Sequence, residues 1–273
     1  MKIHKKVGDR FVSTLKIYQA IAIAHKNRDV SEADTVTLIK DILADVFGYN
    51  KYTELTSEQQ IRGTYCDLAV KIDGQIKYLI EVKSAGIALN DSHLRQAINY
   101  AANQGIEWVV LTNAIDWRLY RVKFGQPIDF DLVSAFELPT INPRNTDDQA
   151  KMFLLCREGI TSDAMSAYHQ HAQLFNKFTI AQFVMSEPVA SVIRRELRRL
   201  FPDLRVDVEQ ITDILANDVL KREVIEGDKV KEAQQRIKKA TTKSMKVAAK
   251  ARMENTSTPA PQPIATAEHS QTE

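Results

Sequence analysis

Apolar residues recur at helical spacing over the first fifty positions and at alternate positions over the next thirty. In residues 8–28 they lie three or four positions apart, and residues 31–48 repeat this pattern after Ser31, a typical helix-capping residue. Between 65 and 83 the spacing becomes that of strands, in two runs joined by an Asp-Gly pair at 73–74. The pattern predicts two helices followed by a β-hairpin.

A third helix and two further strands are expected next. Asp91 or Ser92 is the expected cap of the helix, which runs to about residue 104. Apolar strands follow at 107–114 and 117–124, while the polar stretch 56–65 is expected to be irregular or strand-like. This order of elements is typical of an α/β layered domain, which we expect to end near residue 140.

The sequence changes character after residue 140. Helical periodicity dominates to about residue 222, and Ser186 with Pro188 two positions later predicts a helix start. Residues 206–224 are predicted to form one helix. We therefore divide the chain into an N-terminal helix (1–30), an α/β domain (31–140), a helical domain (141–228) and a basic, then disordered tail (229–273).

Composition limits the classes to which this protein can belong. Hydrophobic residues make up 44% of the 273 residues, which is enough for a sizeable core. The formal net charge is only +2, so any nucleic-acid-binding surface must be local. Cys66 and Cys156 lie in no disulfide-framework or zinc-binding spacing, and no segment has the pattern of a membrane span or a signal peptide. We expect a cytoplasmic protein with no membrane partner.

The segment YLIEVKSAG, residues 78–86, carries the strongest chemical signal. Glu81 and Lys83 are two positions apart in a predicted strand, so their side chains share one face. Asp67 lies in the preceding strand. Two carboxylates and a lysine on neighbouring strands suggest a metal-dependent hydrolytic site, because carboxylate oxygens bind Mg²⁺ and a lysine can hold the attacking water.

This site requires a particular pairing of the two strands. A two-residue hairpin loop would pair Asp67 with Ile80 and place Asp67 on the opposite face from Glu81. A three-residue loop or a β-bulge shifts the pairing by one position and places Asp67 and Glu81 on the same face. We predict one of these two. The apolar residues agree, since the same pairing gathers them on one face: Cys66, Leu68, Val70, Ile72, Tyr78, Ile80 and Val82.

Two more residues, which lie in the next predicted helix, belong to the same candidate site. Gln96 and Tyr100 are four positions apart in LRQAINYA, which places them on one face of a helix. Asp67, the E-x-K motif at 81–83 and this Q-x-x-x-Y pair together resemble the PD-(D/E)XK nuclease motif. More narrowly, residues 31–138 resemble the N-terminal nuclease domain of the HsdR subunit of type I restriction enzymes.

The resemblance implies a restriction-endonuclease-like α/β fold, with a mixed sheet flanked by helices, and a magnesium-dependent endodeoxyribonuclease. It implies that Asp67, Glu81 and the backbone carbonyl of Val82 hold Mg²⁺, for which Mn²⁺ can substitute. Lys83 is then the residue that holds or activates the attacking water.

The resemblance gives three further residues supporting roles. Gln96 and Tyr100 would support the active centre, and Glu32, near the start of the second helix, would hold a metal-bound water or orient Lys83. No residue is assigned to an organic cofactor.

The partners implied by the resemblance follow from a role in restriction or defence. DNA is the expected substrate. The sequence contains no G-x-x-x-x-G-K-[ST] motif, so we expect no ATP motor in this chain and consider a separate motor or specificity protein as a partner. Double-strand cleavage needs two active centres, which a homodimer would supply.

Simpler interpretations of these residues stay open. The 81–83 motif could be an ordinary ion pair on an edge strand, and Asp67 a turn or cap acid. Glu32 fits a first-turn helix acid, which the helix dipole favours. Gln96 could be solvated, and Tyr100 could be packed in the core.

Two other functions also stay open. One is a noncatalytic nucleic-acid-binding or assembly module that retains the nuclease fold, and the other is a helical regulator in which residues 146–222 bind a partner. The four arginines within 194–199 and the basic segment 229–253 fit either a solvated surface or contact with phosphates.

Overall fold

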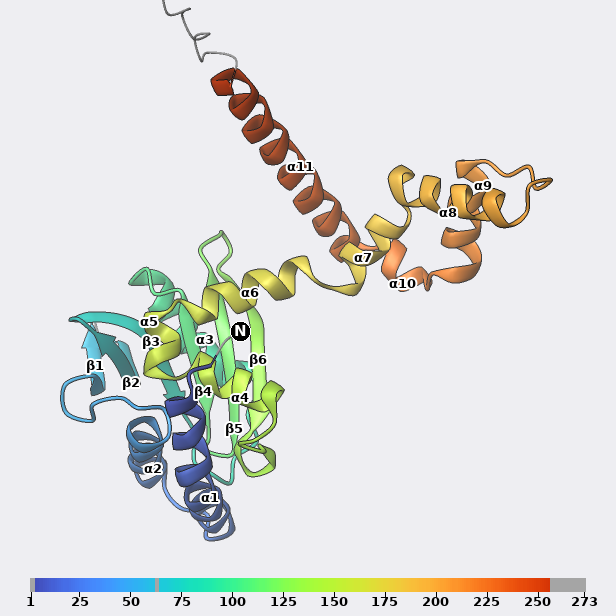
Figure 1. Ribbon diagram of the computed structural model, residues 1–273. Helices are drawn as coiled ribbons and strands as arrows, with labels where there is room; N and C mark the ends of the chain where they lie inside the picture. Colours follow the sequence, from blue (N-terminus) through green and yellow to red (C-terminus); the bar gives the residue numbers. More distant parts are fainter. Residues whose placement is uncertain (1–2, 62–63, 256–273) are drawn as a thin grey trace, which may run out of the picture. The chain divides into compact units, whose positions relative to one another are not determined.

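The computed structural model describes residues 3–61 and 64–255 (Figure 1). The chain divides into two compact units, with the boundary between His169 and Gln170. Among the described residues, no helix is both long enough and apolar enough to span a membrane.

The first unit is built on one six-stranded mixed sheet in the order β1 to β6. Only β3 and β4 are parallel neighbours, and the helix α3 (Asp91–Asn103) connects them. The remaining neighbours are antiparallel. The strands are β1 (Leu55–Ile61), β2 (Thr64–Ile72), β3 (Gln75–Val82), β4 (Trp108–Thr112), β5 (Asp116–Lys123) and β6 (Asp129–Glu137). The predicted α/β fold class is confirmed.

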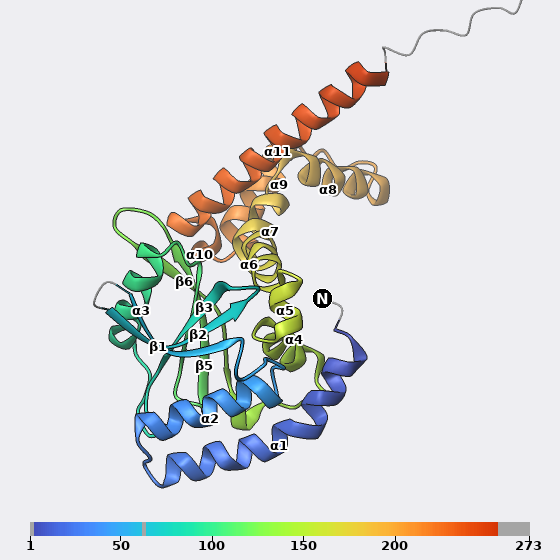
Figure 2. The ribbon, with the colours of Figure 1, turned by 90° about the vertical axis from the view of Figure 1, so that its left-hand side faces the viewer.

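Helices cover both faces of this sheet (Figure 2). The helices α1 (Lys5–Asn27) and α2 (Glu32–Asp45) lie side by side over one face, and α3 packs on the other. Two clusters of buried apolar side chains fill the spaces between these layers. The sheet therefore has two buried faces, which is why its central strands are apolar at nearly every position.

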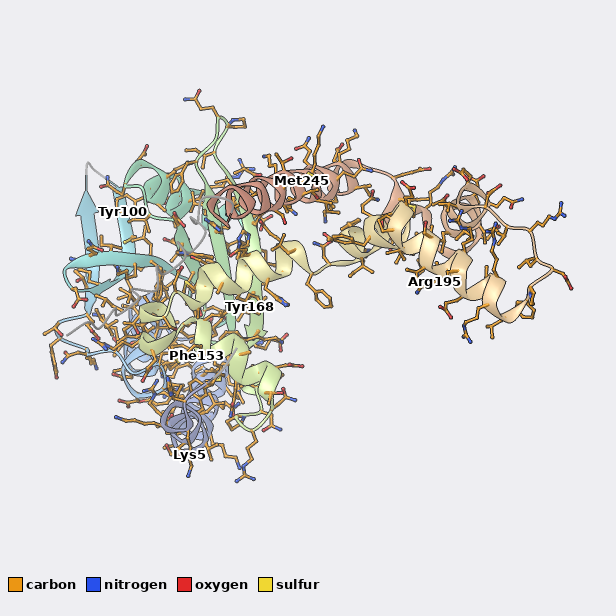
Figure 3. The ribbon with its side chains drawn as sticks, turned by 45° about the horizontal axis from the view of Figure 1, so that its top comes forward. Lys5, Tyr100, Phe153, Tyr168, Arg195 and Met245 are labelled. Carbon is orange, nitrogen blue, oxygen red and sulfur yellow. The ribbon has the colours of Figure 1, made fainter. Side chains whose placement is uncertain are left out.

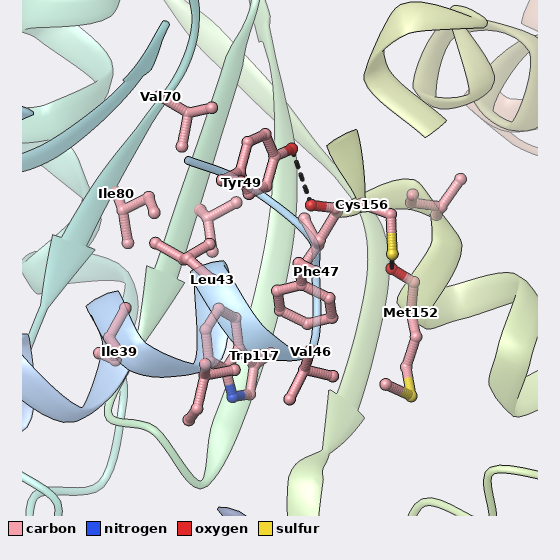
Figure 4. Close-up of a cluster of buried hydrophobic side chains, with 14 of the residues drawn as sticks. Ile39, Leu43, Val46, Phe47, Tyr49, Val70, Ile80, Trp117, Met152 and Cys156 are labelled. Atoms are coloured by element: carbon pink, nitrogen blue, oxygen red, sulfur yellow. Dashed lines mark hydrogen bonds between the residues drawn. The ribbon is translucent and has the colours of Figure 1, made fainter. Parts of the chain in front are cut away.

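The larger cluster joins the first helices to the sheet (Figure 4). Phe47 meets Trp117 edge to face, with ring centroids 5.5 Å apart. The Tyr49 hydroxyl donates a hydrogen bond to the carbonyl of Leu155 at 2.8 Å, so this buried polar group is satisfied. Cys156 is buried in the same cluster, and both cysteines are free thiols, as expected from their spacing.

Local capping explains where the helices begin. The Ser31 side chain accepts a hydrogen bond from the Asp34 amide at 3.2 Å, which confirms the predicted start of α2. The predicted cap of α3 is wrong. Asn90, not Asp91 or Ser92, caps this helix, because its extended backbone lets its side chain accept from the amide of Ser92 at 3.0 Å.

The sequence analysis expects the α/β domain to end near residue 140. The first unit instead continues to His169. The helices α4 (Thr146–Leu154) and α5 (Arg157–Thr161) belong to the first unit. They follow its last strand and bury Met152, Phe153 and Leu154 in its larger cluster. Apolar packing therefore assigns this segment to the α/β unit, although its helical periodicity resembles that of the second.

The second unit is helical throughout its described part. Its helices are α7 (Lys177–Val184), α8 (Glu187–Leu200), α9 (Val208–Ile214), α10 (Arg222–Ile225) and α11 (Asp228–Asn255), and α6 (Ala164–Leu174) spans the boundary. Ser186 is the N-cap of α8, as predicted.

One helix predicted in this unit is wrong, and one prediction falls outside the described residues. Residues 206–224 do not form a single helix, because α9 passes into a π-helical turn (Leu215–Val219) and the extended backbone of Leu220 ends it. The basic segment 229–253 lies within α11. The predicted disordered tail at 256–273 lies outside the described residues.

Candidate active site

The hairpin of β2 and β3 sets the positions of the two acids. Its loop has two residues, Asp73 and Gly74, both with positive φ (52° and 76°). A bulge between Val70 and Lys71 shifts the pairing of the strands by one position beyond it. The predicted bulge is confirmed. This bulge, and not a longer loop, places Asp67 and Glu81 on the same face of the sheet.

Beyond the bulge, Leu68 pairs with Ile80, so Asp67 and Glu81 come next across the two strands and share a face. The opposite face is apolar and packs into the larger cluster through Leu68, Val70, Ile72, Tyr78, Ile80 and Val82, as predicted. Cys66 is the exception. It packs in the cluster beneath α3 instead, so its predicted place among these residues is wrong.

Asp67 joins the two strands at the level of the site. Its Oδ2 accepts a hydrogen bond from the backbone amide of Val82 at 2.7 Å. The amide lies between Glu81 and Lys83 in sequence, so this bond holds the E-x-K segment against β2. Asp67 therefore lies within β2 against the E-x-K segment and is neither a turn acid nor a helix cap.

Lys83 lies at the centre of the site. Its Nζ donates to Oε1 of Glu81 and to the carbonyl of Val82, each at 2.7 Å, and lies 3.5 Å from Oε2 of Glu32. Its backbone amide donates to the carbonyl of Thr112 on β4 at 2.9 Å. Thr112 thus positions Lys83, which sequence alone could not show because the register of parallel strands is not written in a local pattern.

These contacts answer two questions that the sequence left open, one about the ion pair and one about Glu32. The strand β3 lies between β2 and β4, and Lys83 directly follows its last residue, so the ion pair of Glu81 and Lys83 is not on an edge strand. Glu32 begins α2 as a first-turn acid and also lies beside Lys83, so it satisfies both descriptions.

The electrostatics of the site are dominated by an excess of carboxylates. Burial raises the pKa of Glu81 to about 7, and the charges of Asp67 and Glu32 add to this effect, while the hydrogen bond from Lys83 opposes it. Burial alone would lower the pKa of Lys83, but its hydrogen bond to Glu81 and the charges of the three surrounding carboxylates raise it overall. Lys83 therefore stays cationic at neutral pH, and three acids surround one ammonium.

Gln96 and Tyr100 lie at different depths on α3. Tyr100 is buried in the cluster beneath α3, and Gln96 is exposed. The Tyr100 hydroxyl has no hydrogen-bond partner among the described residues, and burial, with a smaller effect of nearby Cys66, raises its pKa. Positions four apart differ by about 40° around a helix, so one can enter the core while the other stays at its rim.

The oxygen atoms gathered here are of the kind that magnesium prefers. Asp67 and Glu81 supply carboxylates and Val82 a carbonyl, and Mg²⁺ commonly takes one or two carboxylates while keeping several waters. The Lys83 ammonium contacts two of these groups, so a positive charge already lies against them. Within residues 3–61 and 64–255, no cluster of three or more His, Cys, Asp or Glu forms an all-protein metal site. The donors fit a magnesium bound mainly by water and substrate.

Comparison with known protein families gives a match within the first unit. Residues 38–135 match the family model of the type I restriction enzyme R protein N terminus (HSDR_N). The matched segment includes Asp67, Glu81 and Lys83 but not Glu32, and the predicted resemblance is confirmed for this segment. Neither a curated protein nor a solved structure matches the chain.

Proposed function

We propose that the first unit is a metal-dependent endonuclease that hydrolyses the phosphodiester bonds of DNA. The observation that carries this proposal is the contact of Lys83 Nζ with Glu81 and with the Val82 carbonyl, each at 2.7 Å, beside Asp67 on the neighbouring strand. The match of this segment to a restriction-enzyme family supports a nuclease module.

In this proposal Asp67, Glu81 and the carbonyl of Val82 hold Mg²⁺, with Mn²⁺ as a substitute. When bound, the cation lowers the pKa of a coordinated water and offsets charge on the phosphate. Three acidic side chains around one ammonium favour a divalent cation at this place.

Lys83 supplies the second positive charge of the proposed site. Its Nζ is held by Glu81 and by Glu32, so it is oriented before the substrate arrives. A fixed ammonium can donate to the attacking water and to a phosphate oxygen, and such preorganised donors cost no reorganisation during the reaction.

Gln96 and Tyr100 take supporting roles in this proposal. Gln96 is exposed on α3, where it is accessible to the backbone of a bound DNA. Tyr100 packs beneath the same helix and fixes its position on the sheet. The proposed context is restriction of foreign DNA, with a separate motor or specificity protein that delivers the nuclease and a homodimer that supplies two centres for double-strand cleavage.

Cleavage of supercoiled plasmid in Mg²⁺ or Mn²⁺ tests the proposal. The wild type should nick or linearise the plasmid, EDTA should stop it, and Lys83→Met should lower the rate by about 100-fold or more. Lys77→Met is the matched control, because Lys77 lies on the same strand and its one hydrogen bond among the described residues is to Gln75, away from the three acids. Undiminished cutting by Lys83→Met would remove Lys83 from the mechanism.

One observation favours a noncatalytic binding module as the second candidate. Lys83 Nζ occupies hydrogen-bonding positions on both Glu81 and Val82, so the site is internally neutralised in part. In that case the wild type binds DNA but does not cut it in either metal, and Lys83→Met leaves binding unchanged.

A further inference from the structure

The helix α8 in the second unit carries a dense group of arginines. Between 194 and 205 the sequence places five arginines against two carboxylates, Glu196 and Asp203. Arg194, Arg195 and Arg198 line one surface depression together with Ser191 and Val192. We propose that this arginine face, defined as Arg194, Arg195, Arg198 and Arg199, binds the phosphate backbone of nucleic acid.

The internal contacts leave most of this charge unneutralised. Arg195 and Arg199 share the single carboxylate of Glu196, at 3.4 Å and 2.8 Å, and their side chains are 71% and 65% exposed. Arg194 has no ion pair within the described part of the chain. The four arginines therefore have one carboxylate among them, and three of them are exposed while Arg194 is half-buried.

The arginine face is held in place rather than being loosely attached. Arg198 Nη2 donates to the carbonyl of Val206 at 2.9 Å, which fixes this side chain against the loop after α8. Ser186 and Pro188 define the start of the helix, so its arginines have a set position along it. Preorganised guanidinium groups lose less freedom when they bind phosphate.

The helix dipole explains only half of the arginines. Arg198 and Arg199 lie in the last turn, where positive charge is stabilised by the helix C-terminus. Arg194 and Arg195 lie one turn earlier, where this effect has faded. Their placement needs another reason, and an extended anion supplies one.

The spacing of the arginines suits a nucleic-acid strand. Arg194 and Arg198 are separated by about 6 Å along the helix, at about 1.5 Å per residue. Two nucleotide steps rise by about 7 Å along one strand of B-form DNA. Arginine is also the side chain whose fork of donors best matches the oxygens of a phosphate.

This inference rests on the proposed function for the choice of DNA as the polyanion. It goes further by giving the second unit a role in binding, with the reaction left to the first unit. A nuclease whose own site holds three carboxylates repels DNA locally, so a separate basic surface that captures the backbone offsets that repulsion.

Fluorescence anisotropy with a labelled 30-base-pair duplex in EDTA tests the inference on the full chain. The variant Arg194→Gln/Arg198→Gln should bind at least 10-fold more weakly than the wild type. The slope of log Kd against log salt should fall by about 2, since each lost phosphate contact removes about 0.9. Glutamine keeps helix propensity, and circular dichroism checks that the fold is kept.

Lys221→Gln/Arg222→Gln is the matched control. It removes the same charge from the same unit, and Arg222 is 85% exposed. Equal affinity and salt slope in the two double variants would overturn the inference. So would a loss of binding to vesicles with anionic lipids together with unchanged DNA binding, because the arginine face would then serve a membrane.

The outcome is independent of catalysis. EDTA prevents cutting, so weak DNA binding by the arginine variant tests α8 alone. A wild type that binds through α8 but does not cut in Mg²⁺ or Mn²⁺ refutes the proposed function and leaves this inference standing.

Discussion

Glu81 gives the clearest quantitative prediction, because its burial makes the stability of the first unit depend on pH. Its pKa is about 7 in the folded protein, against a usual value of 4.5. Between these two pH values the folded protein keeps a proton that the unfolded chain has lost. The free energy of unfolding therefore falls as pH rises through this range and is lowest above it.

The size of the effect follows from the difference between the two pKa values. A change from 4.5 to about 7 corresponds to about 3 kcal/mol in total, of which about 2.5 kcal/mol falls between pH 5 and pH 8. The variant Glu81→Gln cannot ionise and keeps a similar shape. The free energy of unfolding of Glu81→Gln, minus that of the wild type, should rise by about 2.5 kcal/mol over this pH range.

Urea unfolding followed by tryptophan fluorescence measures this difference. The sequence has two tryptophans, and both lie in the first unit, on β4 and β5. The signal therefore reports on the unit that contains Glu81, although the whole chain has two units. EDTA in the buffer keeps the site free of metal.

A second acid provides a control of opposite sign. Burial tends to raise the pKa of Glu158, but the hydrogen bonds from Arg10 and from the backbone, together with the charges of Arg10 and Arg157, lower it overall. Glu158→Gln should therefore lose stability at neutral pH and approach the wild type as the pH falls through the acid range. A Glu81→Gln difference that stays flat from pH 5 to pH 8, or that falls, would refute the account of the buried carboxylates.

Three further substitutions test the packing of the first unit. Arg10→Met should lower the free energy of unfolding by about 2 kcal/mol in urea, since it removes a two-pronged, partly exposed pair with Glu158 at 2.8 Å. Tyr100→Phe should raise it by about 1 kcal/mol, because the buried hydroxyl has no partner among the described residues, and a loss would indicate an unrecognised bond. Gly159→Ala should cost about 2 kcal/mol or more, as its Cβ would lie 1.8 Å from the Phe153 carbonyl, and an unchanged melting temperature would contradict this packing.

The central part of the fold could be predicted because its elements follow simple periodicities. The bulge in the β2–β3 hairpin could also be predicted, since Asp67 and Glu81 share a face only if the pairing shifts by one position. The strand β6 could not. It is an edge strand with Asp129 and Asp131 near its start, and only one of its nine positions is buried, so it shows no apolar alternation.

The candidate site was predictable as a set of residues but not in its contacts. Asp67, Glu81 and Lys83 were identified from local spacing, whereas the anchoring of Lys83 by Thr112 depends on how two parallel strands pair. The different depths of Gln96 and Tyr100 depend on where the sheet meets α3, which helical periodicity alone does not give.

Binding of Mn²⁺, followed by electron paramagnetic resonance of the free ion, tests most directly whether these acids form a cation site. The wild type should bind one Mn²⁺ per chain, and Asp67→Asn should lose this binding while keeping the acceptor for the Val82 amide. Asp73→Asn, in the exposed hairpin turn where asparagine tolerates positive φ, should bind like the wild type. Equal Mn²⁺ binding by the wild type and Asp67→Asn would contradict the account.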